Sequence, residues 1–240
     1  MTAFSHRLLL LGLLIQALEI LPCRAASPAQ DYTIEVLSPD RRYGITVPND
    51  FQSDAGNTLV EVKTGRAIVE LESFDGEIIA NHMNHGGFDG KWSADGTLLY
   101  WGAFGKWTSI AIDILKLKDG KVLWQKNLSP TCQKAILEKT KAADPKGYAR
   151  EKKQNKGNGS HYPEGFTIDV QLDSREPLKL PLKVHVDLTS DVKAGAEPDD
   201  PRLPLRVDSW MEAVLNDDGR LVFGEFHMGR RPEPSKAFGG

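Results

Sequence analysis

The chain has too few cysteines for a disulfide framework. Only Cys23 and Cys132 occur among its 240 residues. Cys23 lies in an N-terminal segment that we expect to be removed, so one thiol would remain and no intrachain disulfide could form. A hydrophobic core therefore has to hold the fold together, and a mature chain of about 215 residues is long enough to bury one.

An excess of one charge sign is also missing. The chain carries 30 Lys and Arg against 33 Asp and Glu. Loss of the first 25 residues removes Arg7, Arg24 and Glu19, which leaves a formal net charge of −4. Proteins that bind nucleic acids usually gather Lys and Arg on one face. We therefore expect no nucleic-acid partner.

No apolar run is long enough to cross a bilayer. The most apolar one, Leu8 to Ile15, is shorter than the ~20 residues that a spanning helix needs. It follows Arg7, and Ala25 stands where a signal peptidase reads a small residue. We predict a cleavable secretory signal over 1–25, export to the periplasm or the cell exterior, and no transmembrane segment after cleavage.

The familiar catalytic motifs are missing as well. The chain has no Gly-X-Ser-X-Gly elbow, no phosphate-binding glycine loop and no dinucleotide fingerprint. Asp40 and Asp95 occupy turns, where an aspartate commonly caps backbone amides. We therefore predict no catalytic residue and no cofactor.

What the N-terminal half does contain is a strand-and-turn pattern. From Asp31 to Lys126, short apolar runs alternate with polar residues and are separated by Pro, Gly, Asn and Asp. The pattern predicts antiparallel strands at Tyr32–Leu37, Tyr43–Val47, Thr58–Val62 and Ala67–Leu71.

An internal repeat with an offset of 55 residues organises this half. Ser38-Pro39-Asp40 corresponds to Ser93-Ala94-Asp95, and Thr64-Gly65-Arg66 corresponds to Asp119-Gly120-Lys121. Two turns with one common offset indicate two copies of the same structural unit. We expect two repeats over 31–128.

These turns resemble those of a known family. Ser38-Pro39-Asp40 and Trp92-Ser93-Ala94-Asp95-Gly96 resemble β-propeller repeats with a Ser-Pro-Asp-Gly turn. The resemblance implies four-stranded blades, but a ring closes with at least ~4 of them, so two would be incomplete. Asn84-His85-Gly86-Gly87, with Tyr162 to Phe166, is also similar to uncharacterised exported bacterial proteins, a resemblance that implies no known activity.

A helical insertion is predicted over 129–157, where Lys, Ala, Gln and Glu become frequent. Ser129 followed by Pro130 is typical of an N-cap and a first helical position, and Asp144-Pro145 repeats this signal. We expect two helices, Thr131–Ala142 and Pro145–Lys156.

The C-terminal part, 166–229, is expected to form an antiparallel meander. Leu178 to Leu188 is apolar at every second position except at Pro181. Because proline cannot donate to a sheet ladder, we expect this strand at a sheet edge or with a bulge. A further hairpin is predicted with strands Leu205–Leu215 and Leu221–Met228. Residues 230–240 are expected to be a disordered tail.

The expected fold class is therefore mainly β. It combines blade-like antiparallel hairpins in an incomplete propeller-like arrangement with a two-helix insertion and a C-terminal antiparallel meander. We expect 26–229 to form a single domain.

Two polar or aromatic clusters are candidate sites. His82, Asn84 and His85 lie in a predicted loop, and two imidazoles three residues apart could share a divalent metal. A structured loop explains the same residues by hydrogen bonds to the backbone. Trp101 and Trp107 flank Gly102 to Lys106, an expected hairpin connection, and exposed aromatics there would suit a sugar or a peptide; core packing is the plainer interpretation.

The leading hypothesis from the sequence is a non-catalytic binding or structural protein of the cell envelope. It would use Asn84, His85, Trp101 and Trp107 to bind an envelope protein or polysaccharide. The alternative is a metal-dependent hydrolase whose metal is held by a histidine cluster around His82 and His85.

Overall fold

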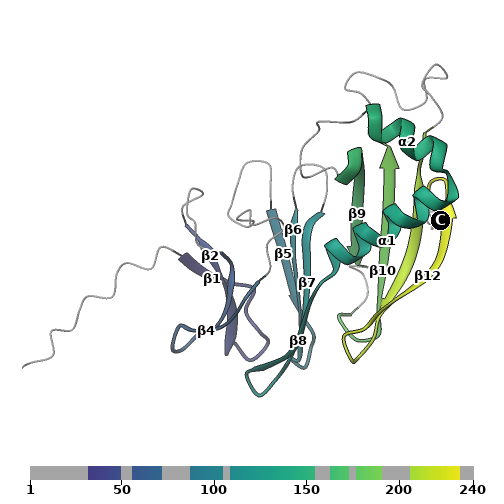
Figure 1. The fold of residues 1–240 in the computed structure, drawn as a ribbon. Coiled ribbons are helices and arrows are strands. Elements are labelled where there is room, and N and C mark those ends of the chain that lie inside the picture. The colour runs from purple at the N-terminus through teal and green to yellow at the C-terminus, as the bar shows by residue number, and fades with distance from the viewer. Residues whose placement is uncertain are drawn as a thin grey trace, which may run out of the picture. The chain divides into compact units, whose positions relative to one another are not determined.

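The computed structural model describes residues 32–49, 56–71, 87–104, 109–154, 163–172, 177–190 and 206–232. All of them belong to one compact unit, Asp31–Gly240, while the predicted signal segment lies outside the described residues. The described residues form three four-stranded antiparallel sheets and two α-helices (Figure 1). The predictions of a mainly β fold, a two-helix insertion and a C-terminal meander are confirmed.

Each sheet is built from four strands that are consecutive in the chain and pair in chain order. The first sheet contains β1 (Tyr32–Glu35), β2 (Tyr43–Pro48), β3 (Thr58–Glu61) and β4 (Arg66–Glu70). The second sheet contains β5 (Gly87–Trp92), β6 (Leu98–Phe104), β7 (Ser109–Lys118) and β8 (Lys121–Asn127). The third sheet contains β9 (Phe166–Leu172), β10 (Leu182–Ser190), β11 (Ser209–Leu215) and β12 (Leu221–Met228).

The first pair of turns related by the 55-residue offset has the same hydrogen bonds. Ser38 Oγ donates to Asp40 Oδ1 at 2.7 Å, and Ser93 Oγ donates to Asp95 Oδ1 at 2.6 Å. In both turns the serine oxygen also accepts the backbone N–H of the residue five positions later, which opens the next strand. The donors around each carboxylate hold the pKa of Asp40 and Asp95 below the usual range.

The second pair of turns closes differently. Glu61 pairs with Arg66 across a four-residue loop, whereas Lys118 pairs with Lys121 across a two-residue loop. That tight loop has φ of 51° at Asp119, so it needs the left-handed region at two successive residues. The 55-residue offset therefore predicts the strands but not the register of this hairpin.

The second sheet contributes to two hydrophobic cores because successive residues of a strand point to opposite faces. One face, with Leu99 and Leu115, packs with residues of the first sheet. The other face, with Leu98 and Ile114, packs with the third sheet and the first helix. Both faces of the middle sheet are thus covered.

The first helix, α1 (Leu128–Ala143), begins three residues earlier than predicted. Asn127 caps it: its side-chain oxygen accepts from the Ser129 backbone N–H at 3.1 Å. The predicted cap at Ser129 is wrong. Asn127, the last residue of β8, occupies the cap position, and Ser129 already lies within the helix. The second helix, α2 (Pro145–Gln154), follows at once, and both lie along the third sheet in Figure 1.

The expectation for Pro181 is also wrong. The strand β10 begins at Leu182, directly after the proline, and it lies between β9 and β11 rather than at an edge. Because Pro181 precedes the strand, it does not interrupt any ladder. In the part of the chain that the structure describes, no helix is both long and apolar enough to cross a membrane.

Candidate functional site

Most of the residues predicted for a site lie outside the described residues. This applies to His82, Asn84, His85 and Trp107. Trp101 is described and lies in β6, where its side chain is only 4% exposed. Its ring packs against Phe88 with a centroid distance of 6.0 Å, so Trp101 is part of the core between the first and second sheets.

The described residues that flank the segments carrying these positions lie at one end of the second sheet. The segment 72–86 leads into Gly87, and the segment 105–108 joins Phe104 to Ser109. Gly87 pairs with Phe104, and Phe104 pairs with Ser109. The register therefore brings the attachment points of both connections together.

The predicted hairpin connection from Gly102 to Lys106 is partly wrong. The strand β6 continues through Gly102, which pairs with Ile112, and ends at Phe104. The ends of the Tyr100 and Phe104 side chains lie over Gly102, so a Cβ at this position would force them to move. Glycine here permits close packing of two aromatic side chains within a strand and does not mark a turn.

A polar face of the third sheet is the richest cluster of functional side chains among the described residues. Along β9, β10 and β11, every second residue points inward, and the apolar ones among them belong to the core or pack against it. The alternate residues point to the opposite face. We call this the outer face; its central row runs across four strands as Asp169, Asp187, Trp210 and His227.

Trp210 and His227 form an aromatic pair on the outer face. Their rings stack with a centroid distance of 4.1 Å and an interplanar angle of 19°. Trp210 is half-buried, and the His227 side chain is 40% exposed. The stack is held in a fixed orientation by a direct cross-strand pair, and part of it remains open to solvent.

An arginine beyond β12 adds a positive charge to this face. One terminal nitrogen of Arg231 lies 2.9 Å from Asp187 Oδ2 and donates to Gln171 Oε1 at 3.3 Å. Arg230 is also fixed, because its Nε lies 3.0 Å from the buried carboxylate of Asp208. Two residues of the predicted disordered tail are thus bound to the sheet, and residues 233–240 lie outside the described residues.

The surroundings of Asp187 disfavour the ionised form of its carboxylate. Burial raises the pKa of Asp187 above its usual value; Arg231 opposes this shift, and the neighbouring carboxylate of Asp169 adds to it. Gln171 donates its side-chain amide to Asp169. A partly desolvated carboxylate gains stability from further hydrogen-bond donors, such as hydroxyl groups of a ligand.

Neither a metal-binding cluster nor a reactive thiol is found among the described residues. Among the described residues, no group of three or more His, Cys, Asp and Glu side chains is placed to hold a metal ion. Cys132 is fully buried in α1, and this burial raises the pKa of its thiol to about 12. Since the thiolate is the reactive form, Cys132 is a structural thiol.

The outer face was missed by reasoning from the sequence, although one signal pointed to it. In β11 the alternation of Met211, Ala213 and Leu215 on one face places Trp210 and Glu212 on the other. A tryptophan on the polar side of a strand is the signal.

Comparisons with family models, with curated proteins and with solved structures find no match to this chain.

Proposed function

We propose that this chain is an exported, non-catalytic binding protein of the cell envelope that holds a polysaccharide on the outer face of its third sheet. The observation that carries the proposal is the row formed by Asp169, Asp187, Trp210 and His227. It combines an aromatic stack with carboxylates and a neighbouring guanidinium on one solvent-facing surface.

The chemistry of this row fits a sugar chain. A pyranose presents C–H groups that pack on an aromatic ring and hydroxyl groups that need planar polar partners. Trp210 and His227 supply the ring surface, and Asp187, Gln171 and Arg231 supply acceptors and a donor. Four strands at a spacing of about 4.8 Å make the row about 14 Å long, so an extended ligand can contact all of it.

We further propose that the first two sheets are blade-like units of an exported bacterial protein. Their support is the four-stranded meander of each sheet and the shared Ser-X-Asp turn at Ser38 and Ser93. In this proposal the signal over 1–25 directs the chain to the periplasm or the cell exterior.

A binding assay with one variant tests the proposed function. The full exported chain is titrated onto immobilised cell-envelope polysaccharides, peptidoglycan included. We expect saturable binding to at least one of them, and binding at least ten-fold weaker for Trp210→Ala. Leu123→Ala is the matched control, because Leu123 is an apolar side chain that is 54% exposed on β8.

Two results would overturn the proposal. One is the absence of binding to every polysaccharide by the folded wild-type chain. The other is equal affinity of Trp210→Ala and Leu123→Ala. Metal analysis addresses the alternative hydrolase: near-stoichiometric metal that is lost in His85→Ala would favour it over the binding protein.

A further inference from the structure

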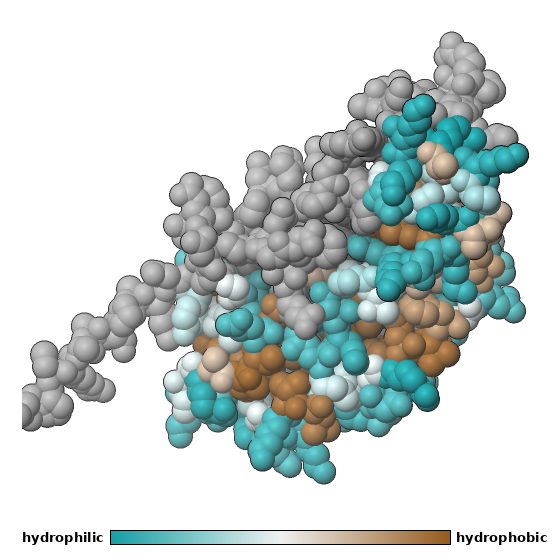
Figure 2. Space-filling model, viewed as in Figure 1, coloured by the Kyte–Doolittle hydropathy of each residue, from teal (hydrophilic) through white to brown (hydrophobic). Residues whose placement is uncertain are grey.

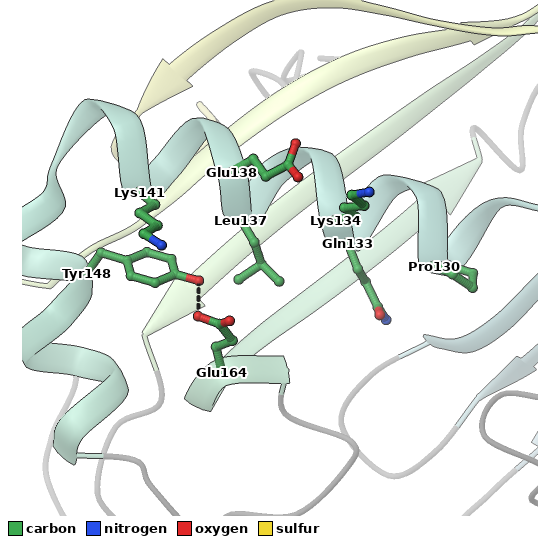
Figure 3. A pocket seen from close by; sticks show the side chains of 8 residues that line it. All are labelled: Pro130, Gln133, Lys134, Leu137, Glu138, Lys141, Tyr148 and Glu164. Carbon is green, nitrogen blue, oxygen red and sulfur yellow. Dashed lines mark hydrogen bonds between the residues drawn. The ribbon is translucent and has the colours of Figure 1, made fainter.

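A pocket of about 360 Å³ lies between α1, α2 and the short 3-10 turn η1 (Pro163–Gly165), away from the outer face. Pockets of 300 Å³ and more are the size that takes small organic ligands. Figure 3 shows the side chains that line it. They are Pro130, Gln133, Lys134, Leu137, Glu138, Lys141, Tyr148 and Glu164.

One stripe of α1 forms a wall of the pocket. Gln133, Leu137 and Lys141 are four residues apart and therefore lie on one side of the helix. In Figure 3 they extend from α1 on the side that faces Glu164 and Tyr148. Along the helix, the wall thus offers an amide, an apolar side chain and an ammonium group. The exposed surface of both helices is mostly hydrophilic (Figure 2).

The opposite wall is fixed by Glu164. Its backbone has φ of 54° and ψ of 20°, a left-handed conformation that costs a residue with a Cβ about 1 kcal/mol. The conformation is held by two contacts of one carboxylate oxygen. Tyr148 donates its hydroxyl to Glu164 Oε2 at 2.5 Å, and Lys152 Nζ lies 2.9 Å from the same oxygen.

These contacts determine the charges of the pocket. The hydroxyl of Tyr148 and the ammonium of Lys152 hold the pKa of Glu164 below its usual value, so Glu164 is ionised at neutral pH. Burial raises the pKa of Tyr148 and keeps its hydroxyl protonated. Glu164 and Lys152 therefore neutralise each other.

Two lysines of the pocket remain available to a ligand. Within the described part of the chain, Lys134 and Lys141 have no carboxylate within 4.0 Å. Lys141 acts on Glu164 only through the longer-range field. Glu138, the second carboxylate of the lining, offsets one of these two ammonium groups. Because Lys152 already offsets Glu164, one ammonium of the lining is left without a compensating carboxylate. At a partly apolar pocket it attracts an anion more strongly than in bulk water.

We infer that this pocket binds a small organic monoanion with an apolar body. Its carboxylate or sulfonate would pair with Lys141, and its apolar part would lie on Leu137. Tyr148 is only 4% exposed and adds little contact surface. The site does not depend on the polysaccharide surface, because none of its lining residues belongs to the third sheet.

A fluorescence titration of the full exported chain with 1-anilinonaphthalene-8-sulfonate tests the inference. This probe has an aromatic body and one negative charge, and it brightens on entering an apolar site. We expect saturable binding of one probe per chain. Lys141→Gln is expected to weaken it at least ten-fold, and Leu137→Ala several-fold.

The matched control is Lys139→Gln, which removes the same charge from an exposed position of α1 that does not line the pocket. Near-UV circular dichroism checks that each variant keeps its packed core. Equal affinity of the Lys141 and Lys139 variants would overturn the inference, as would non-saturable binding or equally tight binding of the uncharged anilinonaphthalene.

Discussion

Ser93 shows how much one hydroxyl contributes to a turn of this protein. Its oxygen accepts the backbone N–H of Leu98 at 2.8 Å and donates to Asp95 at 2.6 Å, while the side chain is buried. Ser38 does the same before Tyr43. The sequence could predict these turns because all their partners lie within five residues, so no tertiary information is required.

Replacement of either serine is expected to destabilise the fold. Ser93→Ala leaves a buried backbone N–H without its acceptor, so the free energy of unfolding should fall by about 1–3 kcal/mol. Ser38→Ala should cost a similar amount because its contacts are the same. Urea unfolding measures both values. Thr64→Ala, at an exposed turn position, is the control and should stay within about 0.5 kcal/mol of wild type.

At the scale of elements, local signals located most strands and both helices but failed where tertiary contacts set the boundary. The segment Gly87–Trp92 contains Asp89 and Gly90, two residue types that disfavour strands. It nevertheless pairs with β6 along its whole length. Similarly, Ser129-Pro130 has the local signature of a helix start, but Asn127 at the end of β8 takes this role. Pairing with a neighbouring strand decided both cases.

The start of α1 gives a prediction that separates the two candidate caps. Asn127→Ala removes the acceptor for the Ser129 N–H and should lower the free energy of unfolding by about 1 kcal/mol. Ser129→Ala should cost nothing or stabilise the protein, because the Ser129 hydroxyl is buried without a hydrogen-bond partner among the described residues.

Thermal unfolding of the two variants measures the difference. A larger loss of stability for Ser129→Ala than for Asn127→Ala would contradict the cap assignment. Unchanged melting of both variants would show that α1 is held by its packed residues, Cys132 and Ile136, rather than by its cap.

At the scale of the whole molecule, burial decided which aromatic residues can bind a partner. The sequence places Trp101 in a crowded aromatic segment, but both faces of the second sheet are covered, and Trp101 lies in a core. The third sheet has one polar face, and there Trp210 remains accessible. Alternation along a strand shows which residues share a face, but it does not show how many faces other elements will cover.

The shared middle sheet also predicts how the protein unfolds. Ile114 belongs to the core with the third sheet, and Leu115, the next residue of β7, belongs to the core with the first sheet. Both are fully buried, so Ile114→Ala and Leu115→Ala should each cost about 2–5 kcal/mol. Because β7 is common to both cores, loss of either core weakens the strand that supports the other. Calorimetry should therefore show one cooperative transition in wild type, shifted to lower temperature in both variants. Two separate transitions, each moved by only one variant, would mean that the cores unfold independently and that β7 does not couple them.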